Sequence, residues 1–363
     1  MFQRFFKNKK ILVTGHTGFQ GTWLTLWLKL LGSDVIGISL KPHTKPSFFD
    51  NVKMKNEIDH YVTDVRKIDK IKEIVSDTKP DFVFHLAAQA IVRESYKNPL
   101  DTFSTNIQGT LNVLDSLRES KVKGCIVYTS DKCYRHTKDN RNFVETDCLG
   151  GNDPYSASKA SAEIVTESYR NSFFKEKNNT KIATVRAGNV IGGGDWGEDR
   201  LIPDFVRAII NKKQIQMRNP KHIRPWQYVL EPIAGILWLA SQISKDGDLS
   251  QAWNFGPHLE QKDFTVKKLI DEFSKEWQLK KSIIKTTKNA KLFEEKYLKI
   301  DPSKADRVLG VKSVYTIKDT ISQTVAWYKN FIEKESSEKD FSIKQIKDFE
   351  NNAKSKKLIW AKQ

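Results

Sequence analysis

Three glycines follow the first apolar run of the chain at a regular spacing. The run KILVT spans Lys10–Thr14, Gly15, Gly18 and Gly21 come directly after it, and a second apolar run covers residues 22–31. A strand that turns sharply into a helix needs glycine for the tight turn, and glycine also lets backbone N–H groups approach a pyrophosphate at the helix N-terminus. The segment therefore predicts a dinucleotide-binding turn, with an ordinary structural turn as the alternative.

Apolar runs typical of buried strands alternate with helical patterns through the first half of the chain. Such alternation favours a parallel sheet whose crossover helices cover both faces. We therefore predict an α/β fold with a doubly wound, Rossmann-like sheet, in which ligands bind beyond the carboxyl ends of the strands. The expected strands are 10–14, 34–39, 60–62, 82–86, 124–129 and 182–186, and the expected helices are 22–31, 68–76, 99–120, 154–174, 203–210, 232–242 and 266–277.

The pattern changes after residue 188, where short elements with glycine and proline between them replace the long alternation. We predict a dinucleotide-binding domain over 1–188, a smaller α/β substrate-binding domain over 189–330 that crosses back to the sheet, and a lysine-rich extension over 331–363. Three apolar residues of this extension would share one face of a helix: Phe341, Ile346 and Phe349. That face would dock on the protein or pair between subunits.

The composition argues against several classes of protein. The formal net charge is +17, but the lysines are scattered among acidic and polar residues, so no nucleic-acid partner is expected. Cys125, Cys133 and Cys148 have no metal-ligand spacing and are too few for a disulfide framework, which predicts no metal and a cytoplasmic location. The apolar stretch 23–31 is too short to cross a bilayer, and no signal-peptide pattern precedes the first strand, so no membrane partner is expected.

Tyr155 and Lys159 stand four residues apart in a strongly helical stretch, which places both side chains on one face, one turn apart. An ammonium beside a phenol favours the phenolate, which a tyrosine needs to remove a hydroxyl proton near neutral pH. Ser130 follows the fifth expected strand and would share the same substrate hydroxyl. The pattern predicts a proton-transfer site. The alternative is that the two residues lie on a solvent-exposed helix and have no catalytic role.

Several longer segments, taken together, resemble those of a known enzyme family. Ser130 opens the segment SDKCY, and the other segments are 15–19, 171–174, 187–196, 200–203 and 223–232. Over roughly residues 10–327 the chain resembles the extended short-chain dehydrogenase/reductase family. Within that family it resembles the nucleotide-sugar 4,6-dehydratases, in which an acidic residue follows the serine or threonine. Most of those enzymes have an Asp-Glu pair there, and Lys132 in the second position is similar to the members that act on CDP-glucose.

The resemblance implies NAD as cofactor and CDP-glucose as the small-molecule substrate. Ser130, Tyr155 and Lys159 would serve oxidation at C4 of the glucose, and the resulting ketone would acidify the C5 proton. Lys132, if held neutral, would remove that proton, and Asp131, kept protonated, would donate to the departing C6 hydroxyl. The reverse assignment of base and acid stays open, as do a plain turn residue at Asp131 and a solvated charge at Lys132.

The product implied by the resemblance is CDP-4-keto-6-deoxyglucose, formed with loss of water and with NAD regenerated in each turnover. Such an enzyme would feed deoxysugar synthesis for a surface polysaccharide and would form a homodimer or homotetramer. The rival interpretations are a dehydratase or epimerase for another nucleotide sugar and, less favoured, a non-catalytic NAD-binding regulator.

The resemblance also implies which residues hold the two ligands. The cofactor set is Gly15, His16, Thr17, Gly18, Phe19, Gln20, Gly21, Asp64, Val65, Leu86, Ala87, Ala88, Tyr155 and Lys159. For the substrate, Asn189 and Arg224 match family positions that hold the diphosphate. Arg200 is expected nearby, and Ser95 is expected to line the glucose pocket.

Two departures from the family pattern bear on the cofactor. His16 stands where the wider family more often has glycine, and its bulk would crowd the pyrophosphate turn. The second expected strand ends without the acidic residue that holds the adenosine ribose. We therefore predict loosely bound NAD that exchanges with solvent, and NADP stays open because Lys41 would face a 2′-phosphate.

Overall fold

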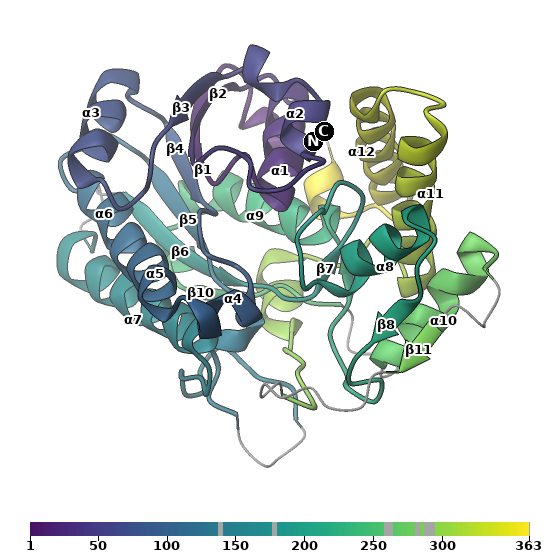
Figure 1. The fold of residues 1–363 in the computed structure, drawn as a ribbon. Coiled ribbons are helices and arrows are strands. Elements are labelled where there is room, and N and C mark those ends of the chain that lie inside the picture. The colour runs from purple at the N-terminus through teal and green to yellow at the C-terminus, as the bar shows by residue number, and fades with distance from the viewer. Residues whose placement is uncertain (137–140, 176–179, 258–263, 280–283, 287–294, 363) are drawn as a thin grey trace.

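The structure is a computed structural model that describes residues 1–136, 141–175, 180–257, 264–279, 284–286 and 295–362. Its centre is a parallel seven-stranded sheet with helices on both faces (Figure 1). Across the sheet the strands follow the order β10 (Ala252–Asn254), β6 (Lys181–Arg186), β5 (Gly124–Tyr128), β4 (Phe82–His85), β1 (Lys10–Thr14), β2 (Asp34–Ser39) and β3 (Asp59–Val62). The order reverses direction between β1 and β4, which confirms the doubly wound sheet and places a ligand crevice at their carboxyl ends.

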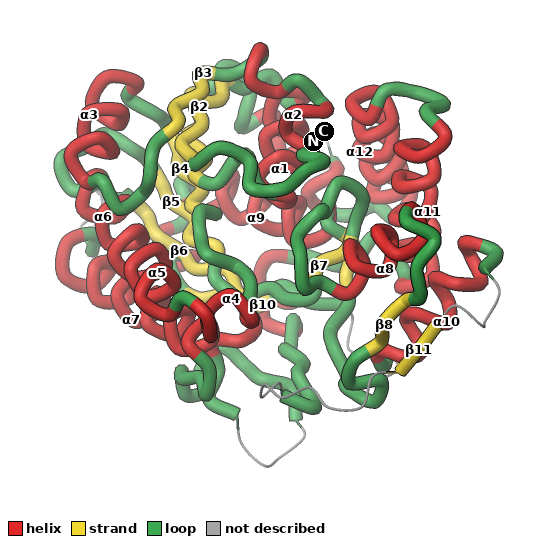
Figure 2. Tube along the Cα trace, viewed as in Figure 1, coloured by secondary structure: helices red, strands yellow, loops and turns green. Residues whose placement is uncertain are grey.

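The helices divide between the two faces of the sheet and a second half of the molecule (Figure 2). Flanking the sheet are α1 (Phe19–Leu30), α3 (Ile68–Thr78), α5 (Pro99–Phe103), α6 (Gly109–Ser116), α7 (Pro154–Phe173) and α9 (Leu230–Ile243). The shorter and later helices are α2 (Phe48–Asn51), α4 (Val92–Lys97), α8 (Leu201–Ile210), α10 (Val266–Trp277), α11 (Ile317–Glu333) and α12 (Glu338–Ser355). Two small parallel pairs, β7 (Val190–Ile191) with β9 (Gln227–Tyr228) and β8 (Ile215–Met217) with β11 (Ile284–Thr286), lie in the second half.

Side chains of the central strands point alternately to the two faces of the sheet, and a separate hydrophobic core lies on each face. In β1, Ile11 and Val13 pack into the core shared with α1 and α9, whereas Leu12 faces the core that includes residues of α3 and α6. Successive strand side chains point to opposite faces, so a strand buried on both faces is apolar throughout. For this reason the six strands expected in the first half are all present with ends within one residue of those predicted.

The helix predicted over 99–120 is present over 99–116, and a π-helical turn lies within it. It consists of α5, the π-helical turn η3 (Ser104–Gln108) and α6, which ends at Ser116, and the backbone keeps helical angles where they join. Asn106 lies in the π-helical turn, where its side chain accepts a hydrogen bond from the Gln89 backbone N–H (2.8 Å) and donates one to the Ser158 hydroxyl (2.8 Å). A single π-turn of this kind is common at functional sites. Here it connects the loop after β4 to α7.

The C-terminal segment is part of the core. Ile346 and Phe349 of α12 are fully buried, and Phe341 packs against the same cluster. Trp27 of α1 stands edge-on to Phe349 at 5.8 Å between ring centroids and donates a hydrogen bond to Glu350 (2.8 Å). The expected apolar face therefore docks within its own chain. The division into domains at 188 and 330 stays a prediction, since β10 and α9 from the second half complete the sheet and its cover.

No helix in the described part of the chain combines the length and apolar character needed to cross a membrane.

Candidate active site

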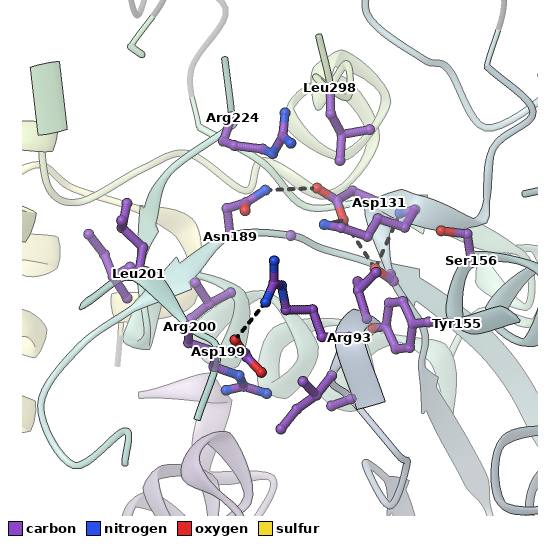
Figure 3. A pocket seen from close by; sticks show the side chains of 18 of the residues that line it. Arg93, Asp131, Tyr155, Ser156, Asn189, Asp199, Arg200, Leu201, Arg224 and Leu298 are labelled. Carbon is purple, nitrogen blue, oxygen red and sulfur yellow. Dashed lines mark hydrogen bonds and ion pairs between the residues drawn. The ribbon is translucent and has the colours of Figure 1, made fainter. Parts of the chain in front are cut away.

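A cavity of about 340 Å³ opens at the carboxyl ends of the central strands (Figure 3). Its walls come from the ends of β4, β5 and β6, from α4 and α7, and from loops of the second half of the chain. The residues that line it include all five predicted catalytic residues: Ser130, Asp131, Lys132, Tyr155 and Lys159. Sequence positions up to 29 residues apart thus meet at the crevice that the sheet topology provides.

Tyr155 is held at the start of α7 by its neighbours. Asp153 caps the helix by accepting a hydrogen bond from the Ser156 N–H (2.9 Å), and Ser95 Oγ accepts one from the Tyr155 N–H (3.1 Å). Burial raises the pKa of Tyr155 to about 12, while a hydrogen bond with Ser130 acts in the opposite direction. The phenol is therefore placed for proton transfer but needs a further favourable charge before it ionises near neutral pH.

Lys159 lies one turn further along α7 and is almost fully buried. Its ammonium donates to the Tyr128 carbonyl oxygen at 3.4 Å, at the end of β5. Burial lowers the pKa of Lys159 to about 8. The favourable influence on Tyr155 that the spacing predicts therefore depends on keeping this buried amine protonated.

Asp131 and Lys132 form a coupled pair in the 3-10 turn η4 (Asp131–Cys133) after β5. Asp131 is fully buried and its carboxylate accepts hydrogen bonds from Ser130 Oγ (3.1 Å) and Asn189 Nδ2 (3.3 Å). It fits beneath Gly188, where an added Cβ would lie 1.8 Å from the carboxylate. The Lys132 ammonium lies 3.5 Å from Asp131 Oδ1. Ser130 caps this turn by accepting a hydrogen bond from the Lys132 N–H, and Asp131 is the first residue of the turn.

The residues predicted to hold the substrate fall into two groups. Asn189, Arg200 and Arg224 line the cavity. Arg200 pairs with Asp195 (3.1 Å), and Arg224 donates to the Ile223 carbonyl (2.9 Å).

Ser95 is placed differently from the prediction. It is fully buried, does not line the cavity, and donates to the Val92 carbonyl (2.6 Å) while it accepts from the Tyr155 N–H. Because its hydroxyl donates to one backbone group and accepts from another, Ser95 positions Tyr155 and does not contact the sugar.

The glycine turn between β1 and α1 fits a pyrophosphate. Gly15 has a φ of +77°, and a Cβ on Gly21 would lie 2.1 Å from the Gly15 carbonyl oxygen, so both positions require glycine. The N-terminus of the 12-residue helix α1 has no side-chain cap. Thr17 bonds to Ser39 Oγ (2.7 Å), and Gln20 lines the cavity. Phe19 is the first residue of α1.

The structure does not support the predicted crowding by His16. Its ring is fully buried beneath Gly37, where a Cβ would lie 2.6 Å from ring atoms, and its Nε2 is 2.7 Å from His60 Nδ1. Burial lowers the pKa of His16 to about 3, so the ring is neutral. The side chain thus points into the core, away from the phosphate turn. Of the two reasons for expecting loosely bound NAD, only the missing acid after β2 remains.

The other predicted cofactor residues lie along the same crevice or beside it. Leu86 and Ala88 line the cavity, whereas the Ala87 N–H donates to Thr14 Oγ1 (3.2 Å) and its backbone lies against Gly15. Asp64 and Val65 lie outside the cavity lining.

Asp64 is held by Arg66 at 2.6 Å, and the Val65 side chain packs against Gly109. The hydrogen bond from Arg66 lowers the pKa of Asp64, which keeps its carboxylate ionised.

Sequence reasoning missed a group of charged residues on the cavity wall. Arg93 of α4 points into the centre of the cavity, with its NH1 3.5 Å from Asp199 and its Nε without a hydrogen-bond partner among the described residues (Figure 3). Asp199 also pairs with Arg218 (3.1 Å). These residues come from three separate segments and carry no local pattern, so no signal in the sequence could have brought them together.

Comparisons with known proteins agree with this geometry. A family model described as GDP-mannose 4,6 dehydratase matches residues 12–324. The chain is 42% identical over 340 residues to the CDP-glucose 4,6-dehydratase of Salmonella typhimurium, which covers 91% of this chain and 93% of that protein.

Solved structures share the fold. A dTDP-glucose 4,6-dehydratase from Streptomyces venezuelae, solved with NAD and TYD bound, has a TM-score of 0.76 and 21% identity, covering 88% of this chain and 97% of that one. An epimerase from Methanothermobacter thermautotrophicus has a TM-score of 0.78 and 22% identity, covering 92% and 97%. The extent of the family match and the identity to the Salmonella protein decide between these two kinds of enzyme: the chain belongs to the nucleotide-sugar 4,6-dehydratases of the extended short-chain dehydrogenase/reductase family.

Proposed function

We propose that the chain converts CDP-glucose to CDP-4-keto-6-deoxyglucose and water. The observation that carries the proposal is the convergence of Tyr155 with the adjacent pair Asp131 and Lys132 on one cavity. An epimerase needs the tyrosine but has no use for an acid and a base that act at C6 and C5. The 42% identity to a CDP-glucose 4,6-dehydratase supports the choice of nucleotide.

The first step asks for proton removal from the C4 hydroxyl. Tyr155 is the base, and Ser130 holds the same oxygen by a hydrogen bond. Lys159, one turn along the same helix, supplies the positive charge that favours the phenolate. The uncapped N-terminus of α1 and the glycine turn would hold the pyrophosphate of NAD, and Leu86 and Ala88 would lie along its path. When bound there, NAD+ would supply the acceptor for the C4 hydride and the source of the hydride that returns to C6.

The second step is an elimination across C5 and C6. The C4 ketone acidifies the C5 proton, Lys132 takes that proton, and Asp131 gives its own to the leaving C6 oxygen, so that water departs. Lys132 Nζ lies 3.5 Å from Asp131 Oδ1, so the two groups serve the same part of the cavity. The same geometry serves the reverse assignment, in which Asp131 takes the C5 proton and Lys132 donates to the C6 oxygen.

Deuterium at C4 of the substrate tests the whole cycle. We expect CDP-[4-²H]glucose to give a product that has lost one water and carries the deuterium at C6, as read by mass spectrometry and NMR. An unlabelled product, or one that changes only its configuration at C4, would contradict the proposal. The second outcome would favour an epimerase.

Arg93 is expected to bind the substrate diphosphate. Its charge is only loosely paired with Asp199, and an arginine fork matches phosphate oxygens. Arg93→Gln should raise KM for CDP-glucose and the Kd of CDP by about 10- to 100-fold, which corresponds to about 1.5–3 kcal/mol for a charge-assisted hydrogen bond, with a smaller effect on kcat. Arg118→Gln on the outer surface is the matched control. Equal KM values for the two variants would contradict this role.

We further propose that the enzyme works in the cytoplasm as a homodimer or homotetramer and supplies deoxysugars for surface polysaccharide such as the O-antigen. The three cysteines form no disulfide, which suits a reducing compartment. Leu100 of α5 and Ile164 of α7 are 85% and 55% exposed and provide apolar surface for a second copy. Analytical ultracentrifugation should find a single species of at least twice the chain mass, and a monomer at micromolar concentration would contradict the assembly.

A further inference from the structure

Glu163 is a buried carboxylate beneath the reacting residues that the chemistry above does not use. It lies on α7, one helical turn beyond Lys159 and two beyond Tyr155, and its side chain is 3% exposed. It does not line the cavity. A buried charge is costly unless it is paired and fully hydrogen-bonded.

The surroundings of Glu163 keep it ionised. Its carboxylate accepts hydrogen bonds from the hydroxyls of Thr129 and Thr184 (2.7 Å for Thr184) and from the Arg186 guanidinium (2.8 Å). Burial raises the pKa of Glu163, but Arg186 and the two hydroxyls more than offset it, so the pKa lies below its usual value. Arg170 of the same helix also faces it. One carboxylate thus connects α7 to the ends of β5 and β6.

Lys159 faces few charged groups apart from the Glu163 carboxylate. Burial lowers its pKa, and the negative charge of Glu163 opposes that effect. Three other titratable groups lie around the ammonium and all are neutral. Burial lowers the pKa of His85 to about 3, raises that of the Cys133 thiol, and raises that of the Tyr155 phenol, one turn along α7, to about 12. The Tyr128 carbonyl supplies a dipole but no charge. Among the groups around Lys159, Glu163 is therefore the one that carries a charge.

Resting on the proposed function, we propose that Glu163 is a positioning residue that holds Lys159 protonated beside Tyr155 and, through Thr129, fixes the strand end that carries Ser130. Residues four apart on a helix are neighbours, so the charge acts over one turn. The backbone supports the second part, because the Thr129 N–H also donates to the Val185 carbonyl (2.8 Å). Glu163 thus acts on the substrate only through other side chains.

Glu163→Gln, compared with Glu167→Gln on the exposed face of α7, tests the proposal. In the wild type, kcat/KM should fall at alkaline pH as Lys159 loses its proton. We expect Glu163→Gln to move this fall about one pH unit lower, since an opposite charge nearby shifts a pKa by about 1–3 units. Above both midpoints kcat/KM would be about tenfold lower. Glu167→Gln should match the wild type.

A second readout does not depend on turnover. A lysine whose pKa is lower in the folded than in the unfolded state takes up a proton on unfolding, so the free energy of unfolding rises with pH between the two values. For Lys159 the rise runs from about 8 to the unfolded value. In Glu163→Gln it should begin about one pH unit lower than in Glu167→Gln.

A lower melting temperature with both pH midpoints unchanged would show a purely structural role and overturn the proposal. If Glu163→Gln does not fold, Glu163→Gln with Arg186→Gln removes both members of the ion pair, leaves no orphaned charge, and should show the same shift. If the wild type fails to dehydrate CDP-glucose, the proposed function fails, whereas the unfolding measurement still decides the role of Glu163.

Discussion

Replacing Tyr155 with phenylalanine is expected to lower kcat for water loss from CDP-glucose by about 10³-fold, within the range that one positioned general base supplies. The ring keeps its packing and only the hydroxyl that bonds to Ser130 is lost. The hydroxyl acts in the transition state and contributes little to ground-state binding. The Kd values of CDP and NAD, measured by calorimetry, should therefore stay within about threefold of the wild type.

Tyr169→Phe on the same helix is the matched control, since Tyr169 packs against Phe173 at 5.0 Å between ring centroids, away from the cavity. It should retain wild-type turnover. Activity of Tyr155→Phe within a few-fold of the wild type would place the base elsewhere and contradict the site assignment.

Asp131→Asn and Lys132→Met are expected to stop the reaction at different points. Each should lower turnover by about 10²- to 10³-fold. In D₂O, Asp131→Asn should still exchange the C5 proton of bound substrate for deuterium, because Lys132 remains as base, while water loss fails. Lys132→Met should lose the C5 exchange as well, and both results are read by mass spectrometry of the recovered sugar nucleotide.

The opposite pattern, with exchange lost in Asp131→Asn and kept in Lys132→Met, would assign the base to Asp131 and the acid to Lys132. Full activity of Asp131→Asn on a nucleotide sugar would exclude the elimination and favour an epimerase.

The sequence could predict those parts of the fold and site that short stretches of chain determine. Buried parallel strands are continuous apolar runs, so their ends could be placed closely. Tyr155 and Lys159 are one turn apart on a single helix, and Ser130 to Lys132 follow a strand end. The π-helical turn around Asn106 could not be predicted in this way, because the partners of its side chain, Gln89 and Ser158, are distant in sequence.

Contacts between distant segments also explain the other differences. His16 was expected to crowd the phosphate turn, but the space beneath Gly37 accepts its ring, and only the paired strands reveal that space. Ser95 was expected to line the glucose pocket, yet its hydroxyl accepts a hydrogen bond from the first turn of α7. Arg93 and Asp199 are 106 residues apart, and the ion pair between them exists only once both halves of the chain are folded.

The most direct test of the account is product formation from four nucleotide sugars, CDP-glucose, dTDP-glucose, GDP-mannose and UDP-glucose, each supplied with NAD+ and followed by mass spectrometry. We expect loss of one water from CDP-glucose, with much slower or no conversion of the other three. Water loss from another nucleotide sugar in preference to CDP-glucose would contradict the substrate, and a change of configuration without loss of water from any of them would contradict the reaction.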